Sequence, residues 1–115
     1  MIEDTIYEFL TSKMTVPVYM EEPPKPPEKM IVIEKTGTSQ ENYLKTATFA
    51  IQSYDTSLYK TAKLNQELKD VMLDGIDGLI SLDEITKVEL NSDYNYTDTT
   101  TKRYRYQAVF VVTHY

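Results

Sequence analysis

Two runs of alternating residues close the chain: Ile85-Thr-Lys-Val-Glu-Leu-Asn-Ser-Asp-Tyr-Asn-Tyr96 and Arg103-Tyr-Arg-Tyr-Gln-Ala-Val-Phe-Val-Val-Thr-His-Tyr115. The polar residues 97–102 separate them, which predicts one long antiparallel β-hairpin. Directly opposed aromatic and branched side chains stabilise such strands by roughly 0.2–1 kcal/mol per pair. We therefore predict the register in which paired residue numbers sum to 200, which gives the pairs Tyr96–Tyr104, Tyr94–Tyr106, Leu90–Phe110 and Val88–Val112.

The composition bounds the class of protein. A chain of 115 residues fits a single domain, here residues 1–115, and the absence of cysteine excludes disulfides and thiolate metal sites. The formal net charge of −6 argues against a surface for non-specific nucleic-acid binding. No apolar run approaches the roughly 20 residues that span a bilayer. The ten tyrosines suit either strands in general or subunit contacts.

The first quarter of the chain predicts a helix followed by a proline-rich connection. Apolar residues recur at helical spacing from about Ile2 to Lys13. The segment Val16–Met20 favours a short edge strand, because Pro17 cannot donate to a strand ladder. All five prolines lie between positions 17 and 27 and predict an extended polyproline II loop. Two roles remain open for this loop: a rigid connector between strands, or a ligand for an SH3-like groove.

Two further strands are expected in the middle of the chain. The apolar run Met30–Glu34 predicts a central strand that ends near Gly37. A polar turn is expected over residues 38–42. The segment Lys45–Tyr54 then alternates, which predicts a strand with one buried face that carries Ala47, Phe49 and Ile51.

The remaining element is a second helix, expected from about Ser57 to Leu73. The residues Asp55-Thr-Ser57 form a typical N-terminal cap, and Gly75 is the expected stop signal. The apolar stripe of this helix should cover the sheet. We therefore predict an α+β fold of element order α-β-β-β-α-β-β, in which both helices lie on one face of a mainly antiparallel sheet of about five strands.

The sequence carries no recognisable catalytic pattern, and we predict a protein that is not an enzyme. The only histidine, His114, is expected to be a strand-end side chain, because a triad needs a rigidly held base. The run Asn91-x-Asp93-x-Asn95 mimics the first three ligands of a calcium loop. Tyr96 and Lys102, however, stand where that loop requires glycine and glutamate, so a solvent-facing strand is the favoured interpretation. No catalytic, cofactor or metal residue is predicted.

One cluster combines basic and aromatic side chains, Lys102-Arg-Tyr-Arg-Tyr106. It could bind phosphate or stack on bases. In the predicted register, Arg103 and Arg105 lie near Asp93 and Asn95, on the face opposite the tyrosine pairs. Local charge balance, or contact with an acidic partner surface, is therefore the favoured interpretation.

Several stretches together resemble a known family: Phe9-Leu-Thr-Ser-Lys13, Val16-Pro-Val-Tyr19, Ile31-Val-Ile-Glu-Lys-Thr-Gly37, Ala47-Thr-Phe-Ala-Ile-Gln-Ser-Tyr54 with Leu58-Tyr59, and the two hairpin runs up to Phe110. They are similar to the tail terminator proteins, also called tail-to-head joining or tail completion proteins, of long-tailed phages and prophages of Gram-positive bacteria. The resemblance covers nearly the whole chain. It consists of strand and helix residues and not of a catalytic signature.

This resemblance implies a structural subunit that forms a hexameric ring on the tail tube and joins it to the head connector. The implied partners are further copies of the chain, the tail tube protein and a head connector or completion protein, with no cofactor, membrane or specific nucleic acid. The implied location is the tail–head junction of the virion, and the host cytoplasm during assembly. The alternatives are another small neck protein, for head completion or in the minor capsid, or a generic protein-interaction module. We expect the proline loop and the hairpin to make the contacts, the latter through Tyr94, Tyr96, Thr99, Thr100, Lys102, Arg103, Tyr104, Arg105 and Tyr106.

Overall fold

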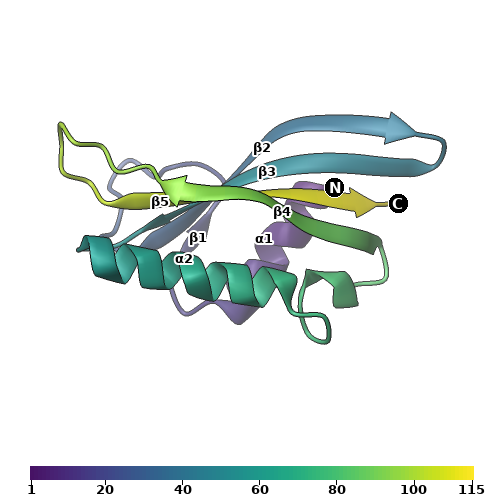
Figure 1. The fold of residues 1–115 in the computed structure, drawn as a ribbon, viewed down its shortest axis with the longest axis horizontal. Coiled ribbons are helices and arrows are strands. Elements are labelled where there is room, and N and C mark those ends of the chain that lie inside the picture. The colour runs from purple at the N-terminus through teal and green to yellow at the C-terminus, as the bar shows by residue number, and fades with distance from the viewer.

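A computed structural model describes residues 1–115, and it shows two helices against one side of a five-stranded sheet (Figure 1). The strand order is β1-β2-β3-β5-β4. The elements are α1 (Ile2–Lys13), β1 (Val18–Tyr19), β2 (Met30–Glu41), β3 (Leu44–Tyr54), α2 (Leu58–Leu73), a 3₁₀ turn (Leu79–Ser81), β4 (Ile85–Asn95) and β5 (Arg105–His114). The predicted α+β class and element order are confirmed.

The main core lies between the helices and the sheet. Helix α1 buries Ile6, Phe9 and Leu10, as its helical spacing predicted. These side chains join one apolar cluster with residues of α2 and of every strand. Its largest fully buried members include Phe49 and Phe110, which face each other across β3 and β5. The opposite side of the sheet carries no helix, and we call it the open face.

Strand β1 makes the sheet mixed, whereas the other strand pairs are antiparallel, as expected of a mainly antiparallel sheet. It pairs in parallel with β2, through Val18–Ile31 and Tyr19–Val32. Two parallel neighbours need a crossing connection. Residues 20–29 supply it, and we call this segment the strap. The strap bends at Pro24 and Lys25, so it is not one straight polyproline II helix.

Strand β2 is longer than predicted and is not central. It continues past Gly37, through an irregularity at Thr36, and pairs with β3 as far as Glu41. The expected turn over residues 38–42 is therefore wrong. The chain reverses instead at Asn42, with φ of 57°, and Tyr43. Polar threonine and serine fit this stretch because both of its faces are exposed to solvent.

Helix α2 begins where its cap was predicted. The Ser57 hydroxyl oxygen accepts a hydrogen bond from the Lys60 backbone N–H at 3.2 Å. The buried stripe includes two polar residues, Thr61 and Asn65, that apolar spacing did not reveal. Gly75 is not a left-handed cap, because no glycine has positive φ.

The hairpin register agrees with the prediction at Val88 and Leu90 and differs after them. Val88 faces Val112 and Leu90 faces Phe110. Asn91 is then left unpaired, and the register shifts so that Tyr94 faces Gln107. A β-bulge of this kind inserts one extra residue, so every later side chain of the strand points to the face of the sheet opposite to the one that regular alternation predicts. The predicted pairs Tyr94–Tyr106 and Tyr96–Tyr104 are therefore wrong.

Candidate functional site

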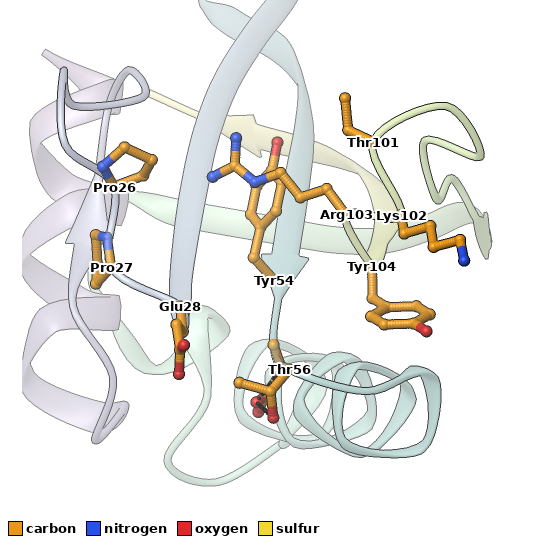
Figure 2. A pocket seen from close by; sticks show the side chains of 10 residues that line it. Pro26, Pro27, Glu28, Tyr54, Thr56, Thr101, Lys102, Arg103 and Tyr104 are labelled. Carbon is orange, nitrogen blue, oxygen red and sulfur yellow. Dashed lines mark hydrogen bonds between the residues drawn. The ribbon is translucent and has the colours of Figure 1, made fainter.

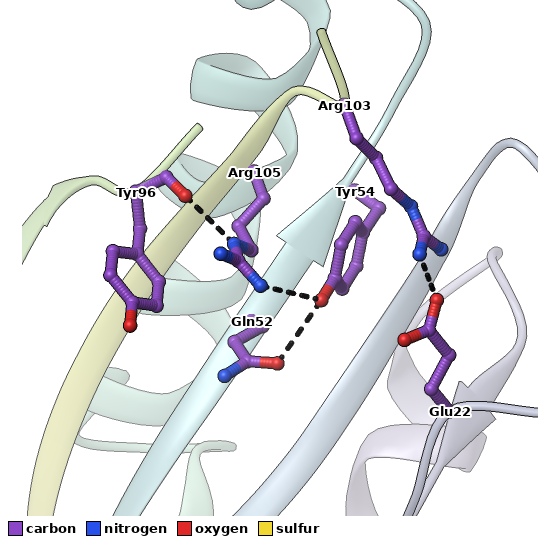
Figure 3. A network of polar contacts seen from close by, with 6 residues as sticks. All are labelled: Glu22, Gln52, Tyr54, Tyr96, Arg103 and Arg105. Atoms are coloured by element: carbon purple, nitrogen blue, oxygen red, sulfur yellow. Dashed lines mark hydrogen bonds and ion pairs between the residues drawn. The ribbon is translucent and has the colours of Figure 1, made fainter. Parts of the chain in front are cut away.

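The candidate site lies on the open face, at the end of the sheet that carries the β4–β5 turn (Figures 1 and 3). Because of the bulge, Tyr94 of β4 and Tyr96 just after it project from the same face as alternate residues of β3 and β5. We call this set the aromatic platform; it consists of Gln52, Tyr54, Tyr94, Tyr96, Arg105 and Gln107.

A chain of hydrogen bonds fixes the platform across three strands. The Tyr54 hydroxyl donates to the Gln52 side-chain oxygen at 3.3 Å, and the Gln52 amide donates to the Gln107 side-chain oxygen at 3.0 Å. The Gln107 amide in turn donates to the Tyr94 hydroxyl. Gln52, Gln107 and Tyr94 are therefore linked across β3, β5 and β4, and Tyr54 is held by Gln52 on its own strand.

Arg105 occupies the centre of the platform and is held by two tyrosines. Its Nε donates to the Tyr96 carbonyl at 2.7 Å, and its Nη1 donates to the Tyr54 hydroxyl at 3.5 Å (Figure 3). The guanidinium carbon lies 4.2 Å from the centroid of the Tyr96 ring. Tyr96 and Tyr94 meet edge to face, with ring centroids 5.7 Å apart. Such cation–π and aromatic contacts stabilise the arrangement by about 0.5–1 kcal/mol each.

Arg103 reaches the other side of Tyr54. Its guanidinium lies 4.5 Å from the Tyr54 ring centroid and forms an ion pair with Glu22 of the strap. Burial lowers the pKa of Arg103, and the nearby charge of Arg105 lowers it further. An arginine stays protonated at neutral pH in spite of such a shift. Two cations are thus held against one buried tyrosine.

The hairpin turn next to the platform is stabilised by its own side chains. The Asn95 side-chain oxygen accepts from the Thr97 backbone N–H at 3.0 Å. Asp98 accepts from the backbone N–H groups of Thr100 and Thr101, and these bonds lower the pKa of its carboxyl. Thr99 and Thr100 are exposed at the tip. Lys102 has a φ of 55°, the left-handed value that closes the turn.

A hollow of about 420 Å³ separates the hairpin from the strap (Figure 2). The strap contributes Pro26, Pro27 and Glu28 to its wall, and the hairpin contributes residues 101–104. Figure 2 shows Arg103 over Tyr54, whereas Tyr104 points away from it, toward the start of α2. Basic and acidic side chains share the lining, so the hollow does not select a ligand of one charge.

The expected interface residues divide between the two faces of the sheet. Tyr94, Tyr96 and Arg105 come together on the open face, with Arg103 beside them. Tyr106 lies on the helix-covered face, because it pairs with Ser53 and Asn95. The expected position of Arg103 and Arg105 near Asp93 is wrong.

Sequence reasoning missed two groups that matter for the site. The glutamines Gln52 and Gln107 were not assigned to it, although their alternation with Tyr54 and Arg105 was visible in the sequence. Glu22 is separated from Arg103 by 81 positions, and no local signal pairs them.

The run that mimics a calcium loop is dispersed by the fold. Asn91 sits in the bulge, Asp93 pairs with Lys69, and the Asn95 oxygen caps the hairpin turn. No three His, Cys, Asp or Glu side chains are grouped to hold a metal ion. His114 lies at the end of β5, as its position in the sequence predicted, and its side chain is buried there.

Comparison with known proteins leaves the resemblance to tail terminators as a prediction. Neither helix combines the length and the apolar character that a membrane crossing requires. No protein-family model matches this chain, and no curated protein sequence matches it.

Proposed function

We propose that this protein is a structural subunit of a phage or prophage tail–head junction, which caps the tail tube as a ring and joins it to the head connector. The observation that supports an assembly role is the aromatic platform. Tyrosine and arginine are enriched among the residues that dominate binding energy in protein interfaces. The identity of the assembly comes from the sequence resemblance described above.

The platform is suited to binding because it is partly exposed and already rigid. Tyr94 and Tyr96 remain 43% and 45% exposed, whereas the polar groups beside them are held by hydrogen bonds within the chain. A partner would therefore order few side chains on contact, which lowers the entropic cost of association. The exposed parts of the two aromatic side chains remain available for burial against a partner.

A ring needs two different surfaces on each subunit, so that the contact repeats head to tail and closes by rotation. The platform provides one such surface at one end of an elongated molecule, whose extents are 44 × 26 × 24 Å. The net charge of −6 also suits a ring around a channel through which DNA must slide without adhering.

Inactivation of the gene in its phage or prophage tests the proposed function. Electron microscopy of the lysate should show filled heads without tails, together with unattached tubes of irregular length, because nothing caps or joins the tube. The wild-type gene supplied in trans should restore joined virions. Normal virions in its absence would overturn the proposal.

Point variants test the part assigned to the platform. The double variant Tyr96→Ala/Arg105→Ala should fold but reduce the yield of joined virions by about tenfold or more, because single interface anchors often contribute about 2 kcal/mol. Tyr59→Ala is the matched control, since Tyr59 is 74% exposed on α2, across the sheet from the platform. Equal yields from both variants would remove the platform from the proposed interface.

A further inference from the structure

We propose that the ion pair between Arg103 and Glu22 is a latch, which holds the strap on the open face and couples it to the hairpin turn. When the latch is broken, the strap and the turn should open together while the rest of the sheet stays closed. The proposal concerns contacts within one chain and does not rest on the proposed function.

Arg103 covers part of a small apolar cluster on the open face, and no helix covers the rest. Met30, Val32 and Tyr54 are buried and form a small cluster with Tyr19, separate from the main core. Met30 pairs with Tyr54 across β2 and β3, so these side chains share the open face, where no helix lies. Besides Arg103, the strap, which lines the same hollow as Tyr54, is therefore the segment left to shield them from water.

Few polar contacts hold the strap in place. Four of its ten residues are prolines, which have no backbone N–H to donate. The bond from the Arg103 guanidinium to the Glu22 carboxylate is the one hydrogen bond between residues 20–29 and the rest of the chain. Segments with so few backbone hydrogen bonds open at a lower free energy than the core.

Arg103 depends on Glu22 as much as the strap does. The guanidinium is partly buried over the Tyr54 ring, and Arg105 places a second positive charge nearby. Removal of Glu22 would leave a partly desolvated cation beside a like charge, a worse state than the loss of an exposed pair. The unpaired charge would affect the turn directly, because the Arg103 carbonyl oxygen accepts a hydrogen bond from the Asp98 backbone N–H at 3.2 Å.

Hydrogen exchange measured by mass spectrometry tests the latch in the free protein. In Glu22→Gln, amides of residues 97–103 should exchange about threefold faster or more, whereas β3 amides should not change. The strap amides donate no hydrogen bonds, so opening of the strap is measured by thiol labelling of Val32→Cys, the single cysteine, which should also become about threefold faster or more. Glu21→Gln is the matched control, because Glu21 is an exposed neighbour with the same charge and no ion pair. Acceleration of the strap without the turn, or of neither segment, would overturn the coupling.

A charge reversal separates the ion pair from a general effect of the substitutions. Glu22→Arg and Arg103→Glu should each accelerate exchange in the turn and thiol labelling under the strap, and the double variant should restore both rates to within about twofold of the wild type. High salt should accelerate the same two rates when Glu22 and Arg103 are both present, because it screens the pair. A double variant no better protected than either single variant would refute the latch.

Discussion

Gly78 stands where the backbone folds back on the end of α2. Its N–H donates to the Asp74 carbonyl at 3.0 Å. A Cβ at this position would lie 2.1 Å from the Asp74 carbonyl oxygen and 2.8 Å from the Asp74 nitrogen, both of which belong to the backbone. Its φ of −78° is ordinary. The position therefore requires glycine for space and not for conformational freedom.

We expect Gly78→Ala to lower the free energy of unfolding by about 1–3 kcal/mol, the usual cost of forcing a group into packed structure. Gly75→Ala is the matched control, because nothing lies within 4 Å of a Cβ there. It should be neutral, or stabilising by up to about 1 kcal/mol through the unfolded chain. Urea unfolding of both variants checks this. Equal effects would show that the turn relaxes freely.

The role of a single residue could be predicted from sequence only where that role depends on its near neighbours along the chain. The Ser57 cap was predicted because a cap needs only the three residues that follow it. The dipeptide Asp77-Gly78 is a typical turn signal, but the need for glycine was not visible, since its close neighbour is the backbone of Asp74 and not a side chain. Gly75 was given the stop role because its position after the helix is typical, although its φ is not positive.

At the scale of elements, the bulge at Asn91 decides which side chains meet. Alternation in the sequence continues through Leu90, Tyr94 and Tyr96 without a visible break. Tyrosine suits both a buried and a half-exposed face, so the change of face after Asn91 leaves no trace in the residue types. The first half of the register was predictable, because the apolar residues Val88 and Leu90 are favoured opposite the apolar Val112 and Phe110.

Deletion of Asn91 should leave the hairpin folded. The unpaired residue disappears, and Ser92 still faces Val109 while Tyr94 still faces Gln107. Deletion of Asp93 is the control, because it moves Tyr94 and Tyr96 to the helix side and removes the partner of Lys69. Thermal unfolding should show a small change for the first deletion and a loss of about 2 kcal/mol or more for the second. The reverse order would contradict the bulge.

Helix α1 is tied to β2 by an ion pair that makes stability depend on pH. The Lys35 ammonium lies 2.7 Å from a Glu3 carboxylate oxygen and lowers the pKa of Glu3 below its usual value of 4.5, against an opposing effect of burial. A carboxyl with a lowered pKa in the folded state stabilises it at higher pH. This contribution is present above about pH 4.5 and is lost as pH falls through the folded value.

Glu3→Gln should therefore be less stable than the wild type at pH 7, and the difference should shrink below pH 4.5. Urea unfolding at a series of pH values measures it. Glu8→Gln is the control, since Glu8 is exposed on the same helix and forms no ion pair. If the two variants showed the same pH profile, the Glu3–Lys35 pair would not act in the folded protein.

At the scale of the whole molecule, the patterns along the chain predicted the elements and their order but not the way the first strand joins the sheet. Helical and alternating periodicity are local, whereas the parallel pairing of β1 depends on where the strap crosses. The crossing strap also places Glu22 next to Arg103 and so completes the candidate site. Long-range contacts of this kind have no periodicity to reveal them.

Whether the molecule unfolds as one unit depends on α1. Its buried residues Ile6, Phe9 and Leu10 belong to the same core cluster as the side chains of α2. Truncation of each large core side chain costs about 2–5 kcal/mol, and the stability of a whole domain is about 5–15 kcal/mol. A chain without residues 1–13 should therefore lose its cooperative transition and its dispersed NMR spectrum. Removal of Tyr115, which is exposed, is the control and should change neither. A cooperative transition in the shortened chain would mean that the sheet and α2 fold without α1, contrary to a single core.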